Sequence, residues 1–160
     1  MHDKIIFARA KIEDAEDIAD IVQKTVAEIY PKYYPPEVAD FFRKLHGCQN
    51  IAGDIQKGRV YVLRDNGIIV GTGSYEKQHI TRVYVLPRYQ GRGYGGYILK
   101  ELEKEIAQRH SRVFLDASLP ACKFYESKGY KAVRHEEVKC EKETVLVYDV
   151  MEKMVAGIYN

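Results

Sequence analysis

The residues with the clearest chemical meaning form the segment QGRGYGG, residues 90–96. Four of its residues are glycines: Gly91, Gly93, Gly95 and Gly96. Glycine permits positive φ angles and lets a ligand approach the main chain closely. A helix that begins directly after such a loop presents unpaired N–H groups and a partial positive charge. The segment therefore predicts an anion site suited to a phosphate or pyrophosphate, to which Arg92 adds a charge-assisted hydrogen bond.

One interpretation of this site is a dinucleotide-binding fingerprint. Gly91, Gly93 and Gly96 satisfy the pattern G-x-G-x-x-G, and Asp116 ends a predicted strand about 20 residues further on. The context agrees less well, because residues 86–90 separate the loop from its strand and the chain ends in consecutive strands instead of a βαβ series. A nicotinamide-dependent oxidoreductase stays open as an alternative.

A second interpretation rests on two blocks of sequence. The block RVYVLPRYQGRGYGGYILKELE (82–103), in which QGRGYG matches Q/R-x-x-G-x-G/A, resembles the strand, pyrophosphate loop and helix of the GNAT family, the GCN5-related N-acetyltransferases. The block FLDASLPACKFYESKGYK (114–131) is similar to the second block of that family. The resemblance runs from residue 4 to about residue 150 and implies one GNAT domain over residues 1–160. It also implies a mixed α/β (α+β) fold, with a central, mostly antiparallel sheet splayed between the fourth and fifth strands and helices on both faces.

The resemblance implies acetyl-CoA (CoA) as the cofactor. In the family, backbone N–H groups of the loop surround the pyrophosphate; the corresponding residues are Gln90, Gly91, Arg92, Gly93, Tyr94, Gly95 and Gly96. The strand before the loop pairs its main chain with the pantetheine arm, and this strand matches Val83, Tyr84 and Val85. An N–H group there, at Val83 or Val85, would serve the oxyanion, a donor typically worth ~2.7–4 kcal/mol. Ser118 stands where many members have an asparagine that binds the arm.

The implied reaction is acetyl transfer from a thioester to a primary amine by direct attack in a ternary complex. Tyr125 matches the family tyrosine that protonates the departing thiolate, and a phenol keeps its proton at neutral pH. Tyr125 is also one of 13 tyrosines, and packing within its helix is the structural alternative. A CoA-binding sensor without turnover is a further functional alternative, which the presence of Tyr125 argues against.

A base must free the amine, because a protonated amine is no nucleophile. His79 stands where several family members have a glutamate, eleven residues before Gln90, and an imidazole accepts a proton near neutral pH. Strand alternation places four side chains on one face if any bulge lies beyond them: His79, Thr81, Val83 and Val85. Glu76 is the second candidate. For both candidates the alternative is a solvated side chain on a strand.

The amine itself stays open at the level of the sequence. We expect residues 25–57 and the strands after residue 130 to select it. The segment AEIYPKYYPPEVADFF (27–42) is rich in aromatic rings, which receive cations or pack in a core: Tyr30, Tyr33, Tyr34, Phe41 and Phe42. A small amine, an amino acid, a peptide terminus and a protein lysine all remain candidates.

The hydrophobic pattern predicts the elements that must position these residues. Strands are expected in the apolar runs 4–10, 78–86, 112–116, 130–138 and 143–150, and as a hairpin around Asn66–Gly67 in 58–76. Helices are expected where apolar residues recur at helical spacing: the segment that Pro31 ends, residues 35–45, Tyr97 to about Arg109, and residues 120–129. The resulting order, βαα-βββ-αβαββ, predicts a mixed sheet covered by helices.

The composition excludes several classes of protein. A formal net charge of +2 does not demand a nucleic-acid or membrane partner. No apolar run of about 18 residues is present to cross a membrane. Three widely spaced cysteines form neither a disulfide framework nor a zinc pattern, so we expect no metal. We expect a cytoplasmic enzyme whose partner is an amine, and a homodimer stays open.

Overall fold

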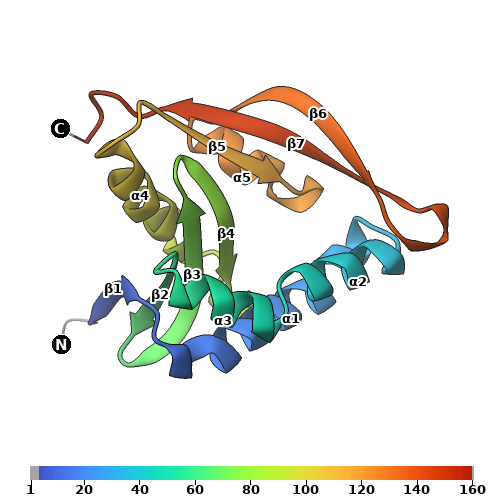
Figure 1. Cartoon of the computed structure of the whole chain (residues 1–160), viewed down its shortest axis with the longest axis horizontal. Helices are drawn as coiled ribbons and strands as arrows, with labels where there is room; N and C mark the ends of the chain where they lie inside the picture. The colour runs from blue at the N-terminus through green and yellow to red at the C-terminus, as the bar shows by residue number, and fades with distance from the viewer. Residues whose placement is uncertain (1–3, 160) are drawn as a thin grey trace.

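The computed structural model describes residues 4–159 and contains a sheet with helices packed on it (Figure 1). The strands are β1 (Ile5–Arg9), β2 (Val60–Asp65), β3 (Ile68–Glu76), β4 (His79–Val85), β5 (Arg112–Ala117), β6 (Lys131–Lys139) and β7 (Val145–Met154). The helices are α1 (Ala15–Ile29), α2 (Pro36–Leu45), α3 (Cys48–Gln56), α4 (Tyr94–Ala107) and α5 (Cys122–Ser127). No helix among these is long and apolar enough to cross a membrane.

The sheet has the strand order β1-β2-β3-β4-β5-β7-β6. Neighbouring strands are antiparallel except β4 and β5, which are parallel and pair only at two positions near the start of β4, His79 with Phe114 and Ile80 with Leu115. Beyond these pairs the two strands separate, so the predicted splay between the fourth and fifth strands is confirmed. A doubly wound parallel sheet, which the dinucleotide interpretation requires, is absent from residues 4–159, and that interpretation is wrong.

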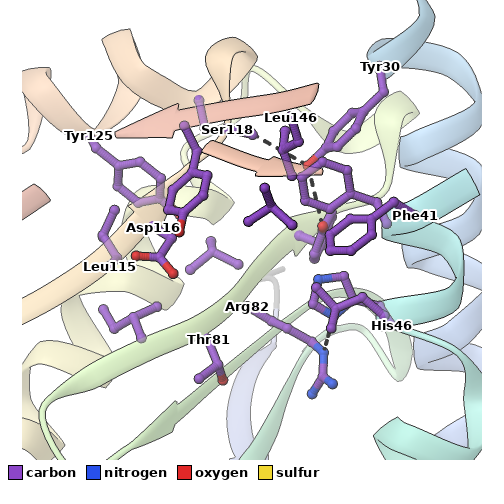
Figure 2. A pocket seen from close by; sticks show the side chains of 18 residues that line it. Tyr30, Phe41, His46, Thr81, Arg82, Leu115, Asp116, Ser118, Tyr125 and Leu146 are labelled. Carbon is purple, nitrogen blue, oxygen red and sulfur yellow. Dashed lines mark hydrogen bonds between the residues drawn. The ribbon is translucent and has the colours of Figure 1, made fainter. Parts of the chain in front are cut away.

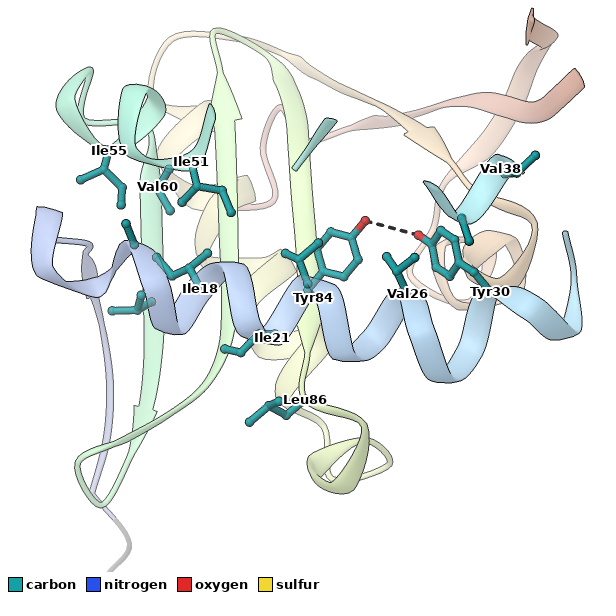
Figure 3. Packing of buried hydrophobic residues seen from close by; sticks show 14 of the residues in the cluster. Ile18, Ile21, Val26, Tyr30, Val38, Ile51, Ile55, Val60, Tyr84 and Leu86 are labelled. Carbon is teal, nitrogen blue, oxygen red and sulfur yellow. Dashed lines mark hydrogen bonds between the residues drawn. The ribbon is translucent and has the colours of Figure 1, made fainter. Parts of the chain in front are cut away.

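Helices cover both faces of the sheet, as predicted. The buried stripe of α1, which includes Ile18, Val22 and Val26, packs on one face together with residues of α2 and α3 (Figure 3). On the other face α4 buries Ile98 and Leu102, and each such fully buried side chain contributes roughly 1.5–3 kcal/mol. The region where β4 and β5 separate lies between these two hydrophobic cores.

Two elements differ from the expectation. Helix α3 was not predicted, because Gly53 and the polar residues around it have low helix propensity. The helix forms because Ile51 and Ile55, one turn apart, enter the core beside α1. Strand β7 continues four residues past the predicted end at residue 150, through the fully buried Met151 to Met154. The other predicted elements are confirmed to within a few residues at their ends.

Strand β4 carries a β-bulge at the point where it leaves β5. Its pairing with β3 shifts register between Ser74 and Tyr75, which leaves Thr81 as the extra residue on β4. The last pair with β5, Ile80 with Leu115, lies one residue earlier. A bulge bends its strand and increases the local twist, so the bend coincides with the start of the splay.

The bulge also reverses the alternation of side chains along β4. Ile80 and Val83 are three positions apart, yet both contact the core on the α4 face. Because neighbouring strand residues point to opposite faces, His79 lies on the α3 face. The expectation that His79 shares a face with Val83 and Val85 required any bulge to lie beyond them, and it is wrong.

Candidate functional site

Two cavities open where β4 and β5 separate. We call the first the aromatic cavity (Figure 2); its volume is about 230 Å³. Its lining includes Tyr30, Phe41, Phe42, His46, Arg82, Val83, Tyr84, Asp116, Ser118, Ala121, Tyr125, Val138, Leu146 and Tyr148. We call the second the glycine-loop cavity; its lining includes Val83, Val85, Gln90, Gly91, Gly93, Gly95, Gly96, Ala121, Phe124, Tyr125 and Lys128. Val83, Ala121 and Tyr125 line both, so the two cavities meet at these residues.

The glycine loop is shaped for close approach of a ligand. Gly91 and Gly93 have φ angles of 80° and 87°, and a Cβ at either position would meet no atom within 4 Å. The first helical hydrogen bond of α4 runs from the N–H of Tyr97 to the carbonyl of Gly93. The N–H groups of residues 91–96 therefore have no acceptor among the residues described, as expected at a helix N-terminus.

The other two glycines of the loop serve packing. A Cβ on Gly95 would lie 3.3 Å from the ring of Phe124, and a Cβ on Gly96 would lie 3.1 Å from the Nζ atom of Lys128. Both neighbours come from the segment that contains α5. The close fit brings the Lys128 ammonium group to the glycine-loop cavity, beside the N-terminus of α4. Sequence reasoning missed Lys128, because its proximity to the loop depends on the packing of α5 against α4.

Polar side chains hold the loop in place. The side-chain amide of Gln90 donates to the carbonyl of Val85 at 3.0 Å, which ties the loop to the end of β4. The guanidinium group of Arg92 lies over the ring of Tyr89, at 5.2 Å from the ring centre. The hydroxyl of Tyr94 donates to a carboxylate oxygen of Asp65 in the β2–β3 hairpin. Gln90 and Tyr94 therefore act as anchors through their side chains.

The main chain of β4 presents alternate residues to the opening. The N–H of Leu86 donates to the carbonyl of Val70 on the β3 side, and antiparallel ladders alternate between bonded and outward-facing residues. By this alternation Tyr84 bonds to β3, while Val83 and Val85 turn their N–H and C=O groups away from it. Of the three predicted main-chain contacts, the structure thus places Tyr84 within the ladder and leaves Val83 and Val85 unpaired with β3. Val85 is buried, and its carbonyl accepts hydrogen bonds from the side chains of Gln90 and Thr25.

Tyr125 lies at the junction of the two cavities. Its ring packs between those of Phe124 and Tyr130, with ring centres 5.2 and 5.7 Å away. Tyr130 is itself fixed, because its hydroxyl donates to the buried carboxylate of Glu103 at 2.8 Å. Burial, and then the neighbouring Tyr30, raise the pKa of Tyr125, so its hydroxyl stays protonated. No group among the residues described is recorded as bonding that hydroxyl, which leaves its proton available.

A chain of hydroxyl groups lies beside this junction. The hydroxyls of Tyr30 and Tyr84 are 3.3 Å apart (Figure 3), and that of Tyr30 reaches Oγ of Ser118 at 3.5 Å (Figure 2). The hydroxyl of Tyr34 accepts a hydrogen bond from the N–H of Leu119 at 2.6 Å, which ties the segment after α1 to the segment after β5. Ser118 thus faces Tyr30 across the splay. Tyr84, predicted through its main chain, contributes its side chain to the aromatic cavity.

The two predicted bases have different surroundings. Glu76 lies at the end of β3, where its carboxylate pairs with Arg59 at 3.1 Å, and it lines neither cavity. His79 lies at the far end of β4 with its Nε2 atom 3.8 Å from a carboxylate oxygen of Asp116. Asp116 lines the aromatic cavity, and both residues line an outer cavity beside α3. The structure thus brings His79 to the site through Asp116, and it does not bring Glu76 there.

A buried polar cluster forms one wall of the aromatic cavity. Arg82 donates from Nε to Nδ1 of His46 at 2.9 Å and pairs through Nη2 with Asp54 at 2.8 Å. Burial, and next the charge of Arg82, lower the pKa of His46 to about 4, so the imidazole is neutral at physiological pH. This cluster joins the end of α2, α3 and the bulged strand. Sequence reasoning missed it, because Asp54 belongs to the unpredicted helix α3 and Arg82 lies 36 positions after His46.

No cluster of residues capable of holding a metal ion occurs within residues 4–159. The aromatic cavity instead has mostly aromatic and aliphatic walls, and the glycine-loop cavity has free N–H groups and a lysine. Such an arrangement can hold an anion at one end, an apolar molecule at the other, and a phenol between them.

Comparison with known proteins places this site in context. A family model described as an acetyltransferase (GNAT) domain matches residues 29–151. The uncharacterized N-acetyltransferase YafP of Escherichia coli K12 is 33% identical over 127 residues, which cover 79% of this chain and 81% of YafP. A GCN5-related N-acetyltransferase structure from Rhodopseudomonas palustris has a TM-score of 0.87 at 24% identity, covering 96% of this chain and 98% of that chain. The PaiA N-acetyltransferase of Thermoplasma acidophilum, solved with coenzyme A, has a TM-score of 0.74 at 17% identity, covering 94% and 99%.

Proposed function

Because the chain belongs to the GNAT acetyltransferase family, we propose that it moves an acetyl group from acetyl-CoA to a primary amine by direct attack in a ternary complex. The observation that carries the proposal is the meeting of the two cavities at Val83, Ala121 and Tyr125. An anion-binding end, a phenol and a separate apolar chamber converge there. Two substrates held in the two cavities would therefore face each other beside Tyr125.

The glycine-loop cavity fits coenzyme A. The space beside Gly91 and Gly93, which any Cβ would partly fill, leaves the N–H groups of the loop open to a pyrophosphate. Lys128 and Arg92 supply positive charge near the N-terminus of α4. The outward N–H and C=O groups of Val83 suit an extended arm that contains amides. When bound there, acetyl-CoA supplies a thioester as the acetyl donor.

Two groups of the chain would then move protons. Tyr125 gives its hydroxyl proton to the sulfur as the C–S bond breaks. A general acid must be protonated at neutral pH, and the Tyr125 hydroxyl meets this requirement. Asp116 takes one proton from the bound ammonium group before the free amine attacks, and His79, 3.8 Å away, passes that proton on to solvent in the outer cavity. The proton that the nitrogen loses after its attack on the carbonyl carbon replaces the one that Tyr125 gives to the sulfur. The N–H of Val83, turned into the opening, is the donor for the carbonyl oxygen.

The affinity for CoA tests the role of the loop. We expect Gly93→Ala to weaken CoA binding roughly tenfold or more, about 1.4 kcal/mol, because the added methyl group enters the space beside the N–H groups. Gly67→Ala, at the tip of the β2–β3 hairpin, is the matched control. Gly67 has a φ of 85° and Gly93 a φ of 87°, and a Cβ added at either position would meet no atom within 4 Å.

Both glycine variants should lose similar stability, about 1–2 kcal/mol, because both place a side chain in the left-handed region. Isothermal titration with CoA and thermal unfolding separate the two effects. Equal CoA affinity in the two variants would show that the loop does not hold the cofactor.

The reaction is tested by release of free thiol from acetyl-CoA in the presence of a panel of primary amines. We expect amine-dependent release above the rate of hydrolysis without amine, with the acetylated amine identified by mass spectrometry. Tight CoA binding without acetylation of any amine would overturn the proposal in favour of a CoA-binding sensor.

A further inference from the structure

On the basis of the proposed function, we infer that the acceptor is a monocationic primary amine with an aromatic or bulky apolar body and no carboxylate group. The inference rests on the walls and the charges of the aromatic cavity. It deepens the proposed function by naming the substrate class that this cavity recognises.

Apolar side chains from α2, β6 and β7 line the aromatic cavity next to its polar wall of His46 and Arg82. Phe41 and Phe42 come from α2, and Val138 and Leu146 come from β6 and β7 (Figure 2). The ring of Phe42 packs edge-on against that of Tyr30, with centres 4.7 Å apart. Rings fixed in this way present a preformed surface, and binding an apolar body to it removes that surface from water.

The charges of the cavity favour a single cation. Arg82 and Asp116 are the charged side chains in the described lining. The charge of Arg82 is balanced by Asp54 at 2.8 Å. Among the residues described, the ionic partner of Asp116 is the Nε2 atom of His79, at 3.8 Å. The cavity therefore retains one carboxylate that an ammonium group can neutralise, and the surrounding rings add attraction for a cation.

The same charges disfavour an acceptor that carries a carboxylate. Such a group would lie near the like charge of Asp116, whose side chain is 50% exposed, and against apolar walls where a carboxylate loses water without gaining a partner. Arg82 is the one cation of the described lining, and its Nε and Nη2 atoms are already bonded to His46 and Asp54. Its Nη1 atom is buried and has no partner among the residues described. A carboxylate could be accepted only by reaching that atom, and this is the outcome that would contradict the inference.

Matched amines test the inference. With acetyl-CoA saturating, we expect kcat/KM for 2-phenylethylamine to exceed that for phenylalanine, ethylamine and 1,4-diaminobutane by about tenfold or more, a difference of about 1.4 kcal/mol. Phenylalanine adds only a carboxylate to the first compound, ethylamine lacks the ring, and the diamine replaces the ring with a second charge. A preference for phenylalanine would overturn the inference and assign its carboxylate to Arg82.

Two variants test whether the aromatic cavity causes the preference for 2-phenylethylamine. Phe41→Ala should reduce the ratio of kcat/KM between 2-phenylethylamine and ethylamine, and Phe41→Leu should largely restore it. Asp116→Asn should bring the ratio between 2-phenylethylamine and phenylalanine close to one, whatever it does to the overall rate. Ratios that both variants leave unchanged would also overturn the inference. If CoA binds and no amine at all is acetylated, the proposed function fails, and the inference fails with it.

Discussion

The Tyr125→Phe variant is expected to acetylate amines at least ~100-fold more slowly than the wild type, since a general acid contributes ~10²–10⁴-fold. The hydroxyl of Tyr125 is protonated because burial raises its pKa, and it lies where the two cavities meet. With Tyr125 as the proposed acid, removing its oxygen would leave the departing sulfur without a proton donor. The ring still packs between Phe124 and Tyr130, so the fold and the affinity for CoA should change little.

Steady-state kinetics with acetyl-CoA and isothermal titration with CoA make this measurement. Tyr33→Phe is the control, because Tyr33 is a half-exposed tyrosine outside both cavities. If the Tyr125→Phe variant acetylates amines at a rate within a few-fold of the wild-type rate, another group gives the proton to the departing sulfur. A loss of CoA affinity that accounts for the whole effect would make Tyr125 a binding residue.

The protein is expected to lose about 3 kcal/mol of stability between pH 6.5 and pH 4 through His46 alone, at about 1.36 kcal/mol per pKa unit. Burial and Arg82 lower the pKa of His46 from 6.5 to about 4. In this window the unfolded chain binds a proton at His46 and the folded chain does not. The contribution of neutral His46 to the stability of the folded protein is therefore fully present above pH 6.5 and is lost as the pH falls toward 4.

The His46→Asn variant isolates this contribution. Its side-chain oxygen can accept the hydrogen bond that Arg82 donates to Nδ1 of His46, and it does not titrate. Urea unfolding at several pH values should give a smaller loss of stability for the variant than for the wild type. Parallel pH profiles for the two proteins would show that His46 is not a neutral, buried group.

Some features of this protein follow from the sequence alone because they depend on neighbouring residues. The buried stripes of α1 and α4 follow from apolar residues at helical spacing, as with Ile98 and Leu102. The hairpin follows from Asn66–Gly67, whose residues both adopt positive φ. The glycine loop was identified by its four glycines ahead of a helix and Tyr125 by the resemblance of its block to the GNAT family, and the structure brings both to the same opening. Their proposed roles stay predictions.

Other features were decided only by the tertiary structure, because they join segments far apart in the chain. The contact between Tyr30 and Ser118 spans 88 positions, and the cluster of His46, Asp54 and Arg82 joins two helical segments to a strand. The bulge at Thr81 moved His79 to the other face of the sheet, which strand periodicity could not predict. Local patterns specify which residues form a helix or strand. The walls of a cavity depend instead on how a bent strand, a splayed partner and distant helices pack together, so the aromatic cavity could be described only from the folded chain.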